Sequence, residues 1–189
     1  RSIPVGAVMV ARASEQLAEQ LRKLAGEALE VAAGDIEFAD GVARGDVSVW
    51  TLPGVDALIA ELSRRDDARL GIVTGNMRAT ARVKLQAVAL HEHFRGGGYG
   101  SDSPVRDQLP GVAIRRMAQA DGTPFDPRRA VMVGDTPHDL SAARAHGMRC
   151  VLVATGQYTR EELAAAGPDV LLDDLGDGER ALRAILKEE

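Results

Sequence analysis

Residues 131–139 read VMVGDTPHD, and this stretch decides how the rest of the chain is interpreted. A short apolar run ends in a Gly-Asp pair, and a second acid, Asp139, follows Asp135 by four residues. Pro137 stands where a first helical residue is expected, because proline is tolerated there and pre-sets its own backbone angle. The order of apolar run, glycine turn and proline predicts a buried strand, a tight loop and the start of a helix.

The two acids of this stretch are placed to act together. Four residues apart at a helix start, Asp135 and Asp139 can point into one crevice at the carboxyl end of a strand, where open α/β sheets bind ligands. Two carboxylates without a lysine or arginine in the same segment favour a hard cation such as Mg²⁺, which takes oxygen ligands and keeps several waters. The alternative is structural, with one aspartate capping the helix and the other solvated.

From residue 51 onward, helical and strand patterns alternate along the chain. Helices are predicted from the LPGV stretch at 52–55 onward and over 77–90, 108–120 and 177–187, and strands over 70–73, 131–134, 149–154 and 170–172. This alternation predicts a parallel sheet with helices on both faces, which is a three-layer, Rossmann-like α/β fold. The glycine-rich stretch 96–100 lacks the spacing of a dinucleotide-binding motif and is interpreted as a crossing over the sheet edge.

The composition argues against proteins that bind nucleic acids, bind membrane surfaces or span a membrane. The 189 residues carry 23 Lys and Arg against 28 Asp and Glu, a formal net charge of −5, without a long block of like charge. This balance favours neither a nucleic acid nor a membrane surface as partner. No apolar run approaches the roughly 18 residues of a membrane helix. The single cysteine, Cys150, stands in a strand-like run and is expected to be buried, and a cytoplasmic location is expected.

The first fifty residues differ in pattern from the rest. The chain is therefore expected to divide into an N-terminal segment, 1–50, and an α/β core, 51–189. Within the N-terminal segment, 14–33 reads as one helix and 5–10 as an apolar run of strand length.

Three motifs in the core fall in an order that resembles one family. A strand ends in Thr-Gly-Asn at 74–76, a basic residue, Arg106, precedes a helix, and the Gly-Asp turn at 134–139 follows. In this order they resemble the haloacid dehalogenase (HAD) superfamily, most closely its phosphoglycolate-phosphatase-like branch, over roughly residues 51–175. Further phrases that fit the branch are LPGV at 52–55, GIVTGN at 71–76, AARAHG at 142–147 and VATG at 153–156.

The resemblance implies a Mg²⁺-dependent phosphomonoester hydrolase that acts on a small phosphorylated metabolite through an aspartyl-phosphate intermediate. By position, Thr74 would donate its hydroxyl to a phosphoryl oxygen, and the amides of Gly75 and Asn76 would donate to the phosphate at a helix N-terminus. Arg106 is the choice for the cation that steadies phosphate and nucleophile, where the family more often has lysine. Lys84 is the alternative, although it stands in the middle of a helix.

The same resemblance assigns the acids of the Gly-Asp turn. Asp135 would be a metal ligand, and Asp139 either a second ligand or an anchor behind the first. Of the nearby histidines, His146 is interpreted as a cation at a helix C-terminus.

The nucleophile that the resemblance implies does not occur in the printed sequence. The family carries it in an Asp-x-Asp motif, on a strand that lies between the strands at 70–74 and 131–134. No Asp-x-Asp occurs among the 189 residues. Two acids are needed there, because one attacks phosphorus and the other protonates the leaving group and later activates water.

Three interpretations stay open. The motif and part of a cap domain precede Arg1; or residues 5–10 form the central strand, with Ala11 and Ala13 in place of the acids; or FADG at 38–41 is a decayed copy. The segment 1–50 is thus a cap remnant, or a replacement strand plus a helix. The chain as printed is expected to be inactive, because loss of a covalent nucleophile costs roughly 10⁴–10⁶ in turnover. The alternative function is a non-catalytic phosphate- and metal-binding module.

Overall fold

The computed structural model describes residues 36–39, 42–45 and 51–186, and the chain divides into two compact units, Arg1–Val49 and Trp50–Glu189. In the first unit, strands β1 (Ile36–Ala39) and β2 (Val42–Gly45) pair antiparallel, with Ile36 opposite Gly45. The apolar run at 5–10 and the expected helix at 14–33 lie outside the described residues.

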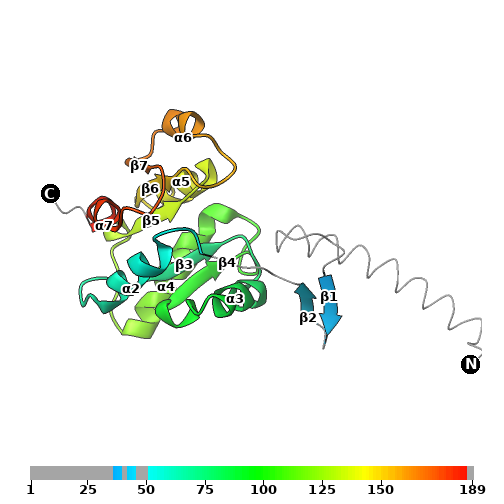
Figure 1. Cartoon of the computed structure of the whole chain (residues 1–189). Helices are drawn as coiled ribbons and strands as arrows, with labels where there is room; N and C mark the ends of the chain where they lie inside the picture. Colours follow the sequence, from blue (N-terminus) through cyan, green and yellow to red (C-terminus); the bar gives the residue numbers. More distant parts are fainter. Residues whose placement is uncertain (1–35, 40–41, 46–50, 187–189) are drawn as a thin grey trace, which may run out of the picture. The chain divides into compact units, whose positions relative to one another are not determined.

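The second unit alternates helices and strands (Figure 1). In chain order its elements are α2 (Val55–Arg64), β3 (Gly71–Thr74), α3 (Arg78–Ala87), β4 (Gly96–Tyr99), α4 (Leu109–Asp121), β5 (Val131–Gly134), α5 (Pro137–Arg144), β6 (Arg149–Val153), α6 (Arg160–Ala166), β7 (Val170–Leu172) and α7 (Gly178–Leu186). Short 3₁₀ turns lie at η2 (His91–His93), η3 (Arg106–Gln108) and η4 (Pro127–Arg129). The predicted alternation of helix and strand is confirmed.

The parallel strands form two sheets within the described residues. β3 pairs with β4, with Thr74 opposite Tyr99, while β5, β6 and β7 pair in that order. β3 and β5 carry the Thr-Gly-Asn and Gly-Asp motifs at their carboxyl ends. On its other edge, neither of these two strands pairs with any strand that the structure describes. No strand that the structure describes therefore stands in the place expected for the Asp-x-Asp strand, between β3 and β5.

Residues 96–99 form strand β4, which corrects the expectation that the glycine-rich stretch only crosses the sheet edge. Side chains have no room at Gly97 and Gly98 of this strand. A Cβ on Gly98 would lie 2.1 Å from the carbonyl oxygen of Leu109, and a Cβ on Gly97 would lie 2.4 Å from Cγ2 of Ile72. Close packing of α4 and β3 against the bare backbone thus overrides the low strand propensity of glycine.

The core covers both faces of the three-stranded sheet, because successive side chains of β6 point to opposite faces. One face packs Cys150 and Leu152 with Met132, Leu140 and Leu163, and the other packs Val151 and Val153 with Leu58, Leu62 and Ala181. Helices on both faces of a parallel sheet confirm the predicted α/β fold. Cys150 is fully buried, as expected. Among the described helices, the longest has 13 residues, so none reaches the length that a bilayer requires.

Candidate functional site

The Gly-Asp turn after β5 is fixed by a capping box at the start of α5. Oγ1 of the N-cap residue Thr136 accepts a hydrogen bond from the Asp139 amide at 3.2 Å, and the Asp139 carboxylate accepts one from the Thr136 amide at 3.2 Å. Pro137 occupies the first helical turn, as the sequence predicts. These reciprocal bonds satisfy amides that the first turn of a helix would otherwise leave unpaired.

The Asp139 carboxylate is buried and has partners on both oxygens. Oδ2 accepts hydrogen bonds from the amides of Asp135 and Thr136, both at 3.2 Å, and from the Thr136 hydroxyl at 2.8 Å. Oδ1 accepts one from Nη2 of Arg106 at 2.5 Å. Gly134 permits this geometry, because a Cβ there would lie 2.5 Å from the Asp139 side chain. A carboxylate with these partners suits an anchor that holds both the turn and Arg106.

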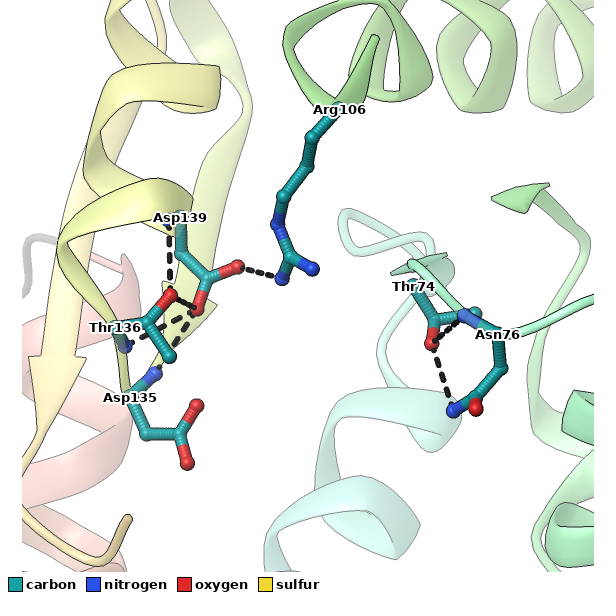
Figure 2. Close-up of polar contacts among 6 residues, drawn as sticks. All are labelled: Thr74, Asn76, Arg106, Asp135, Thr136 and Asp139. Atoms are coloured by element: carbon teal, nitrogen blue, oxygen red, sulfur yellow. Dashed lines mark hydrogen bonds and ion pairs between the residues drawn. The ribbon is translucent and has the colours of Figure 1, made fainter. Parts of the chain in front are cut away.

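Arg106 lies between the two motif-bearing loops (Figure 2). It is the first residue of η3, and its guanidinium is paired with Asp139 from α5. On the β3 side, a Cβ added to Gly75 would lie 3.3 Å from Nη1 of Arg106, so the Gly75 backbone approaches the same guanidinium. Its Nε is buried and has no hydrogen-bond partner within the described residues. A buried N–H of this kind is a donor for a ligand oxygen.

The loop after β3 presents the Thr74 hydroxyl. Its oxygen accepts hydrogen bonds from the backbone amide and the side-chain amide of Asn76, both at 3.1 Å. Because the oxygen accepts both bonds, the hydroxyl proton is left to donate. The family resemblance implies that the Asn76 backbone amide donates to an anion. In the structure this amide donates to the Thr74 hydroxyl oxygen instead.

Asp135 follows β5, and its carboxylate extends away from the Asp139–Arg106 pair (Figure 2). The carboxylate lies against the loop after β6, where a Cβ on Gly156 would stand 2.3 Å from Oδ2. Gly156 was not identified as a site residue, although it belongs to the VATG phrase. In the part of the chain that the structure describes, no group of three or more His, Cys, Asp or Glu side chains could hold a metal ion.

A pocket of about 210 Å³ opens beside Arg106. It is lined by Gly75, Gly100, Ser103, Pro104, Arg106 and Leu109. Gly100 lets two loops meet, because a Cβ there would lie 2.0 Å from the carbonyl oxygen of Gly75. Liquid water occupies about 30 Å³ per molecule, so the pocket has room for a small anion with some of its water. Two of the predicted phosphate-binding residues, Gly75 and Arg106, therefore share one hollow.

The two candidates for the site cation differ in their surroundings. Arg106 contacts Asp139 and the Gly75 backbone, whereas Lys84 lies in the last turn of α3. The ion pair with the Gly-Asp turn favours Arg106.

The chain matches a family model described as HAD-hydrolase-like over residues 110–178, a range that contains Asp135 and Asp139. It is 32% identical over 128 residues to phosphoglycolate phosphatase of Rhodospirillum rubrum, a match that covers 66% of the chain and 51% of that protein. It is 31% identical over 172 residues to protein CbbY of Cereibacter sphaeroides, covering 86% of the chain and 71% of that protein. The chain thus spans about half the length of the phosphoglycolate phosphatase that it matches.

Solved structures share the same fold. The crystal structure of CbbY from Rhodobacter sphaeroides in complex with phosphate aligns with a TM-score of 0.53 and 30% sequence identity. The alignment covers 66% of this chain and 54% of that one.

Proposed function

The chain belongs to the haloacid dehalogenase-like hydrolase family, and we propose that it carries the phosphate- and Mg²⁺-binding part of a phosphomonoester hydrolase of the phosphoglycolate-phosphatase type. The observation that carries this proposal is the position of Arg106. Its guanidinium lies between the Gly75 backbone and the buried Asp139 carboxylate, with a buried Nε–H that no described residue uses. A cation with spare donors, between two motif loops, suits a phosphate dianion.

Each loop contributes a distinct interaction with the phosphate. Thr74 donates its hydroxyl to one phosphoryl oxygen, and the Gly75 backbone approaches another, while the Asn76 amide stays bonded to Thr74. Arg106 donates from Nε and from a terminal nitrogen. Charge-assisted hydrogen bonds of this type are shorter and about twice as strong as neutral ones, so Arg106 supplies most of the affinity. The solved complex of CbbY with phosphate supports this class of ligand.

The two acids of the Gly-Asp turn have different proposed roles. Asp135 is the proposed ligand for Mg²⁺, and Asp139, with four hydrogen bonds of its own, is the anchor for the turn and for Arg106. Mg²⁺ is commonly held by one or two carboxylates plus substrate phosphate, and keeps several waters. One carboxylate in the turn that holds Arg106 through Asp139 fits that pattern, with weak binding in the absence of phosphate. When bound, the ion neutralises charge on the phosphoryl oxygens.

Without an Asp-x-Asp motif, these residues stabilise charge but do not attack phosphorus. Phosphoryl transfer requires an attacking oxygen in line with the leaving group. Thr74 and Arg106 are donors, and Asp139 is held by four hydrogen bonds, so none of them serves as that nucleophile. We therefore propose that residues 1–189 alone bind phosphate and do not hydrolyse phosphomonoesters. The substrates proposed for the complete site are small phosphorylated metabolites.

A non-catalytic phosphate- and metal-binding module is the second candidate function. The missing Asp-x-Asp favours it, since the contacts around Arg106 and Asp139 are intact without that motif. The two candidates make the same prediction for phosphate binding and differ in turnover once two acids are supplied on a strand next to β3 and β5.

The direct test is calorimetric titration of the protein with inorganic phosphate in the presence of Mg²⁺. Arg106→Gln should weaken binding about tenfold or more, which corresponds to a charge-assisted bond of about 1.5 kcal/mol. The matched control is Arg160→Gln, because Arg160 pairs with an exposed acid, Asp173, outside the pocket. Equal affinity of wild type and Arg106→Gln, or an equal loss in the control, would overturn the proposal.

A further inference from the structure

The turn that carries Arg106 is attached to α5 through its next residue, Asp107. The Asp107 carbonyl oxygen lies 2.7 Å from Nε2 of His146, just past the end of α5. The Asp107 carboxylate accepts a second hydrogen bond, at 3.2 Å, from the Ser141 hydroxyl within α5. Because a carbonyl oxygen can only accept, Nε2 of His146 carries the proton. η3 is thus bound to the same helix that contributes Asp139, the partner of Arg106.

The imidazole of His146 has a place prepared for it on α4. A Cβ on Gly111 would lie 2.8 Å from Cε1 of His146, so only a glycine lets the ring lie this close to the helix. Gly111 lies in the first turn of α4, and the close approach of the imidazole gives a reason for a glycine at this position. His146 lies just past the C-terminus of α5, as the sequence predicts, and its ring also bonds to a carbonyl oxygen in another element.

We propose that His146 is a positioning residue for Arg106, assisted by Ser141. The inference rests on the proposed function, in which Arg106 binds the phosphate. His146 and Ser141 hold Asp107, Asp107 fixes η3, and η3 sets the backbone from which the Arg106 side chain reaches Asp139. An arginine side chain loses rotamer freedom when it is ordered, and a fixed backbone reduces the number of arrangements that compete with the paired one.

The first experiment needs no ligand. Hydrogen exchange of the Arg106 Nε–H is measured by ¹⁵N NMR in wild type, His146→Leu and His146→Gln. Loss of one hydrogen bond of about 1 kcal/mol predicts roughly fivefold faster exchange in His146→Leu. His146→Gln keeps an amide donor near the position of Nε2 and should restore the wild-type rate. Arg116, which pairs with Asp102 through its terminal nitrogens, is the internal control and should keep its rate.

Two further variants separate positioning from general loosening. His93→Leu is the matched control, since His93 bonds to Ser63 in α2. Gly111→Ala should speed Arg106 exchange by displacing the imidazole, even though alanine favours the helix, and it serves if His146→Leu does not fold. Unchanged Arg106 exchange in both His146→Leu and Gly111→Ala would overturn the proposal, as would equal acceleration at Arg116.

The second experiment measures the consequence for phosphate. His146→Leu should weaken inorganic phosphate binding by the same roughly fivefold factor, and His146→Gln should recover it. If wild type binds no phosphate, the proposed function fails, while the ligand-free exchange rates still decide whether His146 positions Arg106. If phosphate binds and the His146→Leu affinity is unchanged, the positioning role is refuted and the proposed function stands.

Discussion

Replacement of Asp139 by asparagine should destabilise the fold, because hydrogen-bond donors face both oxygens of the Asp139 carboxylate. In the wild type, Oδ2 accepts three hydrogen bonds from Asp135 and Thr136, and Oδ1 accepts one from Arg106. An asparagine has a single carbonyl oxygen. If this oxygen faces the turn, the amide group confronts the guanidinium, and the reverse orientation places it against three donors. Either arrangement loses an interaction with a charged group, which contributes about 1.5–3 kcal/mol.

The partial exposure of Arg106 to water lowers the expected loss in unfolding free energy. The Arg106 side chain is 39% exposed, so water replaces part of the lost pairing, and the expected loss in unfolding free energy is about 1–2 kcal/mol. The assay is urea unfolding at neutral pH, followed by circular dichroism. Asp173→Asn is the control, because Asp173 is 60% exposed and paired with an exposed arginine, and it should lose less than about 0.5 kcal/mol. Equal losses in the two variants would refute the view that Asp139 is a buried anchor.

Three further predictions concern activity, pH and the thiol. The 189-residue chain should show no hydrolysis of p-nitrophenyl phosphate above background with Mg²⁺, because the described site lacks an in-line nucleophile. Turnover that is lost in Asp135→Ala would contradict this prediction and would mean that another residue of the chain acts as the nucleophile. The hydrogen bond from Arg116 lowers the pKa of Asp102 below its ordinary 3.8, so the stability that this pair provides is present above pH 3.8 and is lost as the pH falls through the lowered pKa. Urea unfolding should show Asp102→Asn less stable than wild type at pH 7, with the difference vanishing in strong acid. A difference that persists in strong acid would contradict the pairing. Burial, and then the nearby Asp139 and Asp169, raise the pKa of the Cys150 thiol to about 12. The thiol should therefore react with a disulfide reagent only when the protein unfolds. Rapid labelling of the folded protein at neutral pH would contradict its burial.

Periodicity predicted most elements of the second unit because local pattern and tertiary packing agree there. The Gly-Asp turn is the clearest case, since Pro137 lies in the first turn of a helix as predicted, although the capping box between Thr136 and Asp139 was not expected. Strand β4 was missed for the opposite reason. Its glycines are selected by contacts with Leu109 and Ile72, which lie far from the strand in sequence, and nothing in the stretch 96–100 itself indicates a strand.

The site shows the same division between local and distant information. The resemblance to a known family identified Arg106 and Asp139, which are 33 residues apart and form an ion pair. No local pattern signals that His146 bonds to the carbonyl of Asp107, because backbone carbonyls have no identity in a sequence. The available clues were Gly111 and the AHG stretch at 145–147, which follows α5. The roles assigned to the site residues, those of Arg106 and Asp139 included, stay predictions until a ligand is measured.

We propose that the loop after β3 and the Gly-Asp turn form one phosphate and Mg²⁺ site. The most direct measurement is the affinity for inorganic phosphate with and without Mg²⁺, in wild type and in Asp135→Asn. Mg²⁺ should tighten phosphate binding to the wild type about tenfold, a coupling of about 1.4 kcal/mol, and should have no effect in Asp135→Asn. Phosphate binding that ignores Mg²⁺ in the wild type, or a Mg²⁺ effect that survives in Asp135→Asn, would contradict the claim.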